Sequence, residues 1–265
     1  MKKIAIITNP DNDKDYRITE SFERELLKYP CEFERIPLGV ELSEDIDMVL
    51  VFGGDGTVMR VSHMAAPLGL PILGVNMGRV GYTLELEKDE KSMLSLYFEE
   101  KYTVEERMML SACCPSGEVL DALNDVVVSL GERARMTNLS LKSNDEEVAS
   151  YFGNGVIIST PTGSSAYSLS AGGPIISPTV SCLLVTPICS HSLSDRPVIF
   201  DDSSILTVTN NSRNETKSIL NIDGIDIAVI NVGESITVKK SKLKTKFIRL
   251  KNDGFCSILS KKMRK

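Results

Sequence analysis

Residues 53–57 combine three glycines with one carboxylate, in the order Gly53-Gly54-Asp55-Gly56-Thr57, directly after the apolar run 47–52. Because glycine has no Cβ, the backbone of such a segment can approach a polyanion closely, and its N–H groups can bind phosphate. Asp55 would then place a negative charge beside phosphate, which is unfavourable unless the carboxylate handles a proton, a metal ion or a hydroxyl group. The alternative is a tight strand-to-helix turn in which Asp55 caps the helix.

A second polar segment follows another predicted strand and reads Ser159-Thr160-Pro161-Thr162-Gly163-Ser164-Ser165-Ala166-Tyr167-Ser168-Leu169-Ser170-Ala171-Gly172-Gly173-Pro174. Pro161 and Gly163 predict a turn, and Ser164 or Ser165 is predicted to cap a short helix. The segment would present hydroxyls, N–H groups and the ring of Tyr167 in one place. These groups suit ribose, pyrophosphate and a nucleobase. The alternative is a Ser/Thr-rich loop with Tyr167 in the core.

The first third of the chain alternates strand and helix signals, which predicts a parallel sheet covered on both faces. The expected strands are 4–8, 48–52 and 71–75, and the expected helices are 16–29 and 58–66. In open sheets of this kind, ligands bind outside the carboxyl ends of the strands. Gly53–Thr57 lies at such an end, and so does the loop Asn76–Gly81.

From about Glu105 the chain changes to short β-rich runs separated by turns, which predicts a mostly antiparallel sandwich or layered β-domain. The expected strands are 119–130, 138–142, 156–159, 182–186, 205–209 and 218–222. Asp223-Gly224 between two such runs predicts a two-residue hairpin. We therefore expect an α/β domain at 1–104 and a β-rich domain at 105–246, with 247–265 packing back on the first domain.

The bulk properties are those of a soluble globular protein: 265 residues, 42% hydrophobic and 25% charged, with a formal net charge of −6. This charge argues against general nucleic-acid binding. No apolar run approaches the ~20 residues needed to span a bilayer. The six cysteines form no CxxC pair and are expected to be free thiols in a reducing compartment, the cytoplasm. With only two histidines, a His-rich metal site is not expected.

Together, the glycine turn and the Ser/Thr-rich segment resemble the signatures of the NAD kinase family, the enzymes that phosphorylate NAD to NADP. Three further segments resemble the family in the same order along the chain: Asn76-Met77-Gly78-Arg79-Val80-Gly81-Tyr82, Ala122-Leu123-Asn124-Asp125-Val126-Val127 and Thr186-Pro187-Ile188-Cys189-Ser190-His191-Ser192-Leu193-Ser194. The resemblance implies an N-terminal α/β domain with a Rossmann-like parallel sheet, a C-terminal β-rich sandwich, and a ligand site between them.

By the matched positions, the resemblance makes Asp55 the general base and also a substrate contact. The other residues it implies in nucleotide binding are Gly56, Arg60, Asn124, Asp125, Arg135, Asn154, Ser165, Ala166, Tyr167, Ser168, Leu169 and Ser170. No residue is assigned as a metal ligand. The implied small-molecule partners are NAD and ATP, with a divalent cation, Mg²⁺, accompanying ATP, and neither nucleic acid nor a membrane is expected as a partner. The family also suggests a homo-oligomer.

The chain departs from the family pattern in the stretch Tyr151-Phe152-Gly153-Asn154-Gly155. Phe152 stands where an arginine is common and Asn154 where an acid is common, and Ile225 replaces a frequent glutamine. The chain also has no Gly-x4-Gly-Lys-Ser/Thr loop, so the P-loop mechanism is not supported.

Two other hypotheses remain open from the sequence alone. One is a kinase of another Gly-Gly-Asp-Gly family that acts on a lipid or a sugar phosphate. The other is a non-catalytic relative that binds NAD or NADP without transferring phosphate, which the departures at Phe152 and Asn154 keep open.

Overall fold

The structure is a computed structural model that describes residues 1–78, 81–131, 136–213, 215–252 and 254–263. It divides into two compact units, of which unit 1 comprises Met1–Arg107 with Lys244–Lys265 and unit 2 comprises Met108–Leu243. The chain leaves unit 1 along strand β6 (Thr103–Cys113) and returns to it along the 15-residue strand β17 (Ser235–Arg249).

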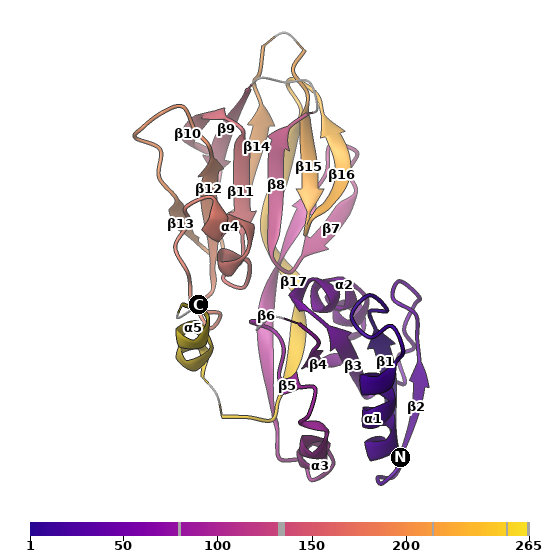
Figure 1. The fold of residues 1–265 in the computed structure, drawn as a ribbon. Helices are drawn as coiled ribbons and strands as arrows, with labels where there is room; N and C mark the ends of the chain where they lie inside the picture. The colour runs from indigo at the N-terminus through magenta and orange to yellow at the C-terminus, as the bar shows by residue number, and fades with distance from the viewer. Residues whose placement is uncertain (79–80, 132–135, 214, 253, 264–265) are drawn as a thin grey trace. The chain divides into compact units, whose positions relative to one another are not determined.

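Unit 1 is built on a parallel sheet in the order β2-β1-β3-β4 (Figure 1). Its strands are β1 (Lys2–Thr8), β2 (Cys31–Arg35), β3 (Met48–Gly53) and β4 (Pro71–Asn76). The short β5 (Leu86–Glu87) and the end of β17 both pair with β4 in parallel. The strand order reverses at β1, whose neighbours are β2 on one side and β3 on the other. Such a reversal is where open α/β sheets form ligand sites.

The helices of unit 1 are α1 (Arg17–Leu26), α2 (Asp55–Ala65), α3 (Leu94–Phe98) and α5 (Phe255–Met263), with the 3₁₀ turns η1 (Ala66–Leu68) and η2 (Lys91–Met93). Phe22 of α1 packs edge-on against Phe52 of β3, with ring centroids 5.1 Å apart, in a fully buried core. Helix α2 begins at Asp55, three residues before the predicted start, because Gly54 is extended and serves as its N-cap.

Unit 2 contains two sheets. One has the order β10-β9-β14-β17 and also includes β6 and β7; the other has the order β13-β12-β11-β8-β15-β16. The remaining strands are β7 (Val119–Ala122), β8 (Asp125–Leu130), β9 (Thr137–Ser143), β10 (Glu146–Gly153), β11 (Gly155–Ser159), β12 (Cys182–Ile188), β13 (Val198–Asp201), β14 (Leu206–Asn210), β15 (Ser218–Ile222) and β16 (Ile225–Ile230). The six-stranded sheet is antiparallel throughout.

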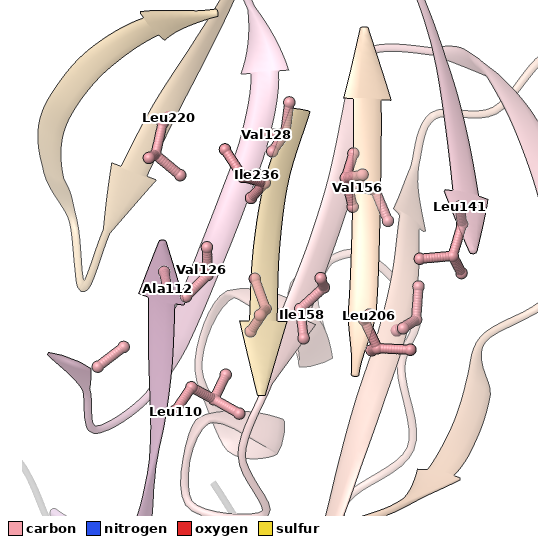
Figure 2. Packing of buried hydrophobic residues seen from close by; sticks show 14 of the residues in the cluster. Leu110, Ala112, Val126, Val128, Leu141, Val156, Ile158, Leu206, Leu220 and Ile236 are labelled. Carbon is pink, nitrogen blue, oxygen red and sulfur yellow. The ribbon is translucent and has the colours of Figure 1, made fainter. Parts of the chain in front are cut away.

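The core of unit 2 is formed by side chains at alternate positions of both sheets, as expected for a sandwich (Figure 2). Val156 and Ile158 of β11 alternate in this way, and Leu206 of β14 and Ile236 of β17 face the same core. The predicted fold class, an α/β domain followed by a β-rich sandwich, is therefore confirmed.

Two local features of unit 2 position residues of the candidate site: a break between two strands and a hairpin turn. The run predicted as one strand, 119–130, is two strands, because the chain breaks at Leu123-Asn124 between β7 and β8. The predicted hairpin is confirmed: Asp223 and Gly224 have φ values of 48° and 82° and connect β15 to β16, whose residues Ile222 and Ile225 pair. Positive φ at both positions is the signature of a type I′ turn.

Within the described ranges, no helix has both the length and the apolar character required to cross a lipid bilayer.

Candidate functional site

Asp55 lies at the first turn of α2, directly after the carboxyl end of β3, and its carboxylate is held by the loop that follows β4. The backbone N–H groups of Tyr82 and Thr83 donate to Oδ1 at 3.0 Å each, and the Tyr82 N–H also lies 3.1 Å from Oδ2. The Thr83 hydroxyl donates to Oδ1 at 2.6 Å. Asp55 therefore does not cap its own helix, as the alternative interpretation supposed. It is a half-buried carboxylate in a fixed orientation.

Gly81 permits this close approach, Gly53 permits close packing against Thr57 within the turn, and two other glycines line open space. A Cβ on Gly81 would lie 2.6 Å from Oδ1 of Asp55, and a Cβ on Gly53 would lie 2.5 Å from Cβ of Thr57. By contrast, a Cβ on Gly54 or on Gly56 would meet nothing within 4 Å. The turn therefore uses some glycines for packing and leaves others where a ligand can come close to the backbone.

Behind the Tyr82–Thr83 loop lies a group of charged side chains, of which Arg107 is buried and Glu85, Glu105 and Arg249 are half-buried. Arg249 donates through Nη1 to the carbonyl oxygen of Thr83 at 3.2 Å and to Glu85 at 3.3 Å, and through Nε to Glu105 at 2.6 Å. Arg107 pairs with the other carboxylate oxygen of Glu105 at 2.8 Å. Burial disfavours ionisation of Glu105, but Arg249 and Arg107 outweigh it and lower the pKa of this carboxyl. Burial lowers the pKa of Arg107.

In unit 2, the Asn124-Asp125 motif is fixed by another aspartate. The carboxylate of Asp223 accepts hydrogen bonds from the backbone N–H groups of Leu123 at 2.7 Å, Asn124 at 2.8 Å and Asp125 at 3.0 Å. The N–H of Asp223 in turn donates to the carbonyl oxygen of Asp125 at 3.0 Å. The hairpin turn thus clamps the break between β7 and β8.

The Ser/Thr-rich segment packs directly on this motif. The hydroxyl of Thr160 donates to the carbonyl oxygen of Leu123 at 2.6 Å, and its N–H donates to that of Asn124 at 2.8 Å. A Cβ on Gly163 would lie 2.1 Å from the Asn124 carbonyl oxygen, so only glycine fits there. Two segments that the sequence analysis singled out separately are therefore in contact within unit 2.

The short helix of this segment differs from the prediction. It consists of a 3₁₀ turn, η3 (Gly163–Ser165), and α4 (Tyr167–Ser170), and neither has a side-chain cap. Ser164 and Ser165 do not serve as caps because their hydroxyls bond to backbone groups: Ser164 to Pro161 and Ile176, and Ser165 to Thr162.

The predicted binding residues 165–170 divide into two classes. Ser168 is fully buried, and its hydroxyl bonds to that of Thr186 at 2.8 Å, so its side chain serves the fold. The other five are accessible to a ligand: Ser165 and Ala166 are half-buried, and Tyr167, Leu169 and Ser170 are exposed. Tyr167 is 46% exposed, which rules out the alternative of a core tyrosine.

Asp125 is 5% exposed and lies beside Asp223. Burial, reinforced by the negative charge of Asp223, raises the pKa of Asp125 to about 7. The side chain therefore changes charge near neutral pH, far above the ordinary range of an aspartate.

The remaining predicted site residues are not gathered with these groups. Asn154 precedes β11, whereas Thr160 follows it, so the five residues of β11, about 17 Å, separate Asn154 from the Asn124 motif. Arg60 is exposed on α2. Arg135 lies outside the described residues.

The described part of the chain contains no group of three or more His, Cys, Asp or Glu side chains that could hold a metal ion. Mg²⁺ is commonly held by one or two carboxylates together with substrate phosphates, and one carboxylate beside a glycine turn suits that arrangement.

Sequence reasoning missed three residues that shape the site: Gly81, Thr83 and Asp223. Gly81 stood within a motif already singled out, but nothing local shows that it faces Asp55, 26 positions away. Asp223 was recognised only as part of the hairpin turn. Its second role, as an acceptor for backbone N–H groups about 100 residues away in the chain, has no local sequence signal.

The pKa of Asp125 has a consequence for stability. Because the folded protein binds this proton more tightly than the unfolded chain, whose aspartates titrate near 4, Asp125 stabilises the fold at low pH. This contribution is lost as the pH rises through about 7. We expect Asp125→Asn to flatten the decline in the free energy of unfolding between about pH 4 and pH 8, by on the order of a few kcal/mol. Urea titrations of ligand-free protein across this range measure the difference, and parallel pH profiles for both proteins would contradict the prediction.

Comparison with known proteins gives these arrangements a context. Residues 38–102 match the family model of the ATP-NAD kinase N-terminal domain, and residues 123–250 match that of the ATP-NAD kinase C-terminal domain. The NAD kinase of Thermoanaerobacter sp. (strain X514) is 37% identical over 281 residues, covering 99% of both chains. The NAD kinase of Desulforamulus reducens is 40% identical over 229 residues, covering 84% of this chain and 79% of the relative.

Solved structures show the same fold. Yeast NADH kinase complexed with NADH has a TM-score of 0.88 at 24% identity, covering 100% of this chain and 88% of the yeast chain. An NAD kinase from Archaeoglobus fulgidus in complex with ATP has a TM-score of 0.81 at 25% identity, covering 99% of this chain and 98% of the Archaeoglobus chain. With both family models matched in order and relatives similar over nearly their whole length, the chain belongs to the NAD kinase family, a family of phosphate-transferring enzymes that act on NAD.

Proposed function

We propose that Asp55 is the general base for transfer of the γ-phosphate of ATP to the 2′-hydroxyl of the adenosine ribose of NAD, which yields NADP and ADP. The observation that carries this proposal is the fixed carboxylate of Asp55, which lies beside two glycines that a ligand can approach closely. The direct test is an assay of purified protein with NAD and Mg-ATP, in which NADP is detected by an NADP-dependent dehydrogenase.

In this reaction, the 2′-oxygen forms a bond to the γ-phosphorus as the bond between that phosphorus and the β,γ-bridging oxygen breaks. The hydroxyl proton passes to the carboxylate of Asp55. Because the transition state of phosphoryl transfer is loose, orientation contributes more than base strength. The hydrogen bonds from Tyr82 and Thr83 supply that orientation before the substrate binds.

NAD is the ligand we assign to the motif of unit 2. Asn124 offers an amide that both donates and accepts, and Asp125 offers a carboxylate that accepts from ribose hydroxyls. The exposed ring of Tyr167 offers a flat surface for a nucleobase. Ser168 acts indirectly, by fixing α4 to Thr186 of β12.

A divalent cation, Mg²⁺, is proposed to accompany ATP, with Asp55 as the protein carboxylate closest to it. When bound, the cation would neutralise charge on the triphosphate.

We also propose that the enzyme works in the cytoplasm, since its cysteines are free thiols. A homo-oligomer through an edge strand is proposed as well: β16 is an edge strand and exposes Ile225 and Val229.

Asp55→Asn keeps the size of the side chain but removes the base. We expect normal folding and NAD binding, with kcat reduced by about 10²–10⁴-fold. Thermal unfolding and NAD titration by calorimetry provide the controls. A variant that retains most of its activity would remove Asp55 from the mechanism.

Gly81→Ala tests whether the position of Asp55 matters. The added Cβ would lie 2.6 Å from Oδ1, so the carboxylate must move, and a displacement of about 1 Å costs on the order of 100-fold in rate. Gly78→Ala is the matched control, because a Cβ there meets nothing within 4 Å. Steady-state kinetics of both variants should show a large fall in kcat for Gly81→Ala alone, and equal effects would contradict the assignment.

If ribose hydroxyls donate to Asp125, NAD binds the ionised carboxylate preferentially. The KM for NAD should then fall as the pH rises from 6 to 8, through the pKa of about 7. In Asp125→Asn this pH dependence should disappear. A KM that varies identically in both proteins would show that Asp125 does not contact the ribose.

A further inference from the structure

Arg249, the last residue of β17, takes no part in the proton transfer proposed for Asp55, yet its guanidinium bonds to the loop that holds this carboxylate. Its Nη1 donates to the carbonyl oxygen of Thr83 at 3.2 Å. The N–H and the hydroxyl of Thr83 in turn donate to Oδ1 of Asp55 at 3.0 and 2.6 Å. Thr83 therefore links the guanidinium to the carboxylate, and all three residues belong to unit 1.

The guanidinium of Arg249 is itself held in one orientation. Its Nε donates to Glu105 at 2.6 Å, and its Nη1 lies 3.3 Å from Glu85. Its central carbon lies 5.3 Å from the centre of the Phe247 ring, which is fully buried. Because the guanidinium is planar and rigid, contacts at two edges and on one face fix the direction in which Nη1 points.

The loop that receives this bond is anchored on both sides of the Thr83 carbonyl. On one side, the backbone of Tyr82 and Thr83 bonds to Asp55. On the other, the N–H of Glu85 donates to the carbonyl oxygen of Gly74 in β4 at 2.9 Å. Thr83 is 6% exposed, so its carbonyl oxygen would be costly to leave without its donor. If the guanidinium were lost, we expect the peptide unit after Thr83 to rotate and to displace the Thr83 hydroxyl.

We propose that Arg249 is a positioning residue for phosphoryl transfer. By holding the carbonyl oxygen of Thr83, it sets the position of the Thr83 hydroxyl and N–H, and thereby that of the carboxylate of Asp55. The inference rests on the proposed function, since the position of Asp55 controls the rate only if Asp55 is the base. An arginine that served the fold alone would alter stability and leave kcat of the folded enzyme unchanged.

The first test exchanges the guanidinium for an ammonium. Arg249→Lys keeps the positive charge beside Glu85 and Glu105, but an ammonium carries its donors on one atom and cannot reach both carboxylates and the Thr83 carbonyl as the fork does. Bonds to charged acceptors are about twice as strong as neutral ones, so we expect the Thr83 carbonyl to lose its donor. We expect kcat to fall at least about tenfold, with the KM for NAD within about twofold of the parent value.

Lys244→Met is the matched control for this test. Lys244 lies on the same strand and pairs with Glu106 of β6 at 2.6 Å, as Arg249 pairs with the neighbouring Glu105. The control thus removes another ion pair between β17 and β6, and we expect kcat to stay at the parent value. An unchanged kcat in Arg249→Lys, or an equal fall in Lys244→Met, would overturn the proposal and leave the proposed function intact.

A double-mutant cycle tests whether Arg249 acts through Asp55. In the Asp55→Asn background the base is absent, so its position no longer matters, and adding Arg249→Lys should lower the residual kcat by less than about twofold. Single-turnover assays at high enzyme concentration can measure this residual rate. An equal fold loss in both backgrounds would show that Arg249 acts elsewhere and would overturn the proposal.

Hydrogen exchange tests the same contact without turnover. We expect the N–H groups of Tyr82 and Thr83 to exchange at least about tenfold faster in Arg249→Lys. Leu26→Ala, a fully buried position on α1, is the control for general destabilisation of unit 1. Unchanged exchange in Arg249→Lys, or an equal increase in Leu26→Ala, would overturn the proposal. Faster exchange confined to Arg249→Lys, in a protein that makes no NADP, would support its hold on the loop and contradict the proposed function.

Discussion

The chemistry proposed for unit 1 depends on one constraint: the carboxylate of Asp55 must meet the backbone of the Tyr82–Thr83 loop at hydrogen-bond distance. This contact requires that position 81 have no side chain, because a Cβ there would occupy the space of Oδ1. It also requires β3 and β4 to be adjacent and parallel, so that the loops after both strands lie at the same edge of the sheet. The parallel sheet is thus the means by which residues 26–28 positions apart form one site.

In unit 2, as in unit 1, an aspartate carboxylate holds a loop by accepting hydrogen bonds from its backbone N–H groups. Asp223 accepts three backbone N–H bonds from Leu123–Asp125, as Asp55 accepts bonds from Tyr82 and Thr83. The carboxylate of Asp223 fixes the backbone of the Asn124-Asp125 motif, to which we assign NAD. Its charge also has an electrostatic effect, because together with burial it keeps part of the Asp125 population protonated near neutral pH. In the NAD complex that we propose, hydroxyl donors of the ribose would offset the cost of ionising Asp125, and substrate binding would then be linked to ionisation.

The sequence predicted what periodicity and local motifs encode. Buried strands such as β1, β3 and β11 have continuous apolar runs, and the Asp223-Gly224 turn has its own signature. Several strands were not predicted, and for two of them, β2 and β17, the physical reason is clear. In β2 polar residues dominate because the strand is at an edge, and in β17 outward-facing lysines alternate with a buried face that includes Ile236 and Val238. The partners of Asp55 and Asp125 could not be predicted, because which loops meet is decided by strand order and not by neighbours in the chain.

The charged side chains behind the Tyr82–Thr83 loop, which are buried or half-buried, serve to position that loop more than to stabilise the fold. Replacing a buried ion pair with apolar side chains is often neutral or stabilising, so Arg249, Glu105 and Arg107 need not be there for stability alone. A hydrophobic side chain at position 249 could not, however, donate to the Thr83 carbonyl and to Glu85 at the same time. Glu85 in turn accepts hydrogen bonds from the N–H groups of Leu250 and Lys251. The Glu85 carboxylate is therefore held in place, and with it the guanidinium of Arg249. A charged network therefore specifies one position for the Thr83 backbone, and through it one position for the carboxylate of Asp55.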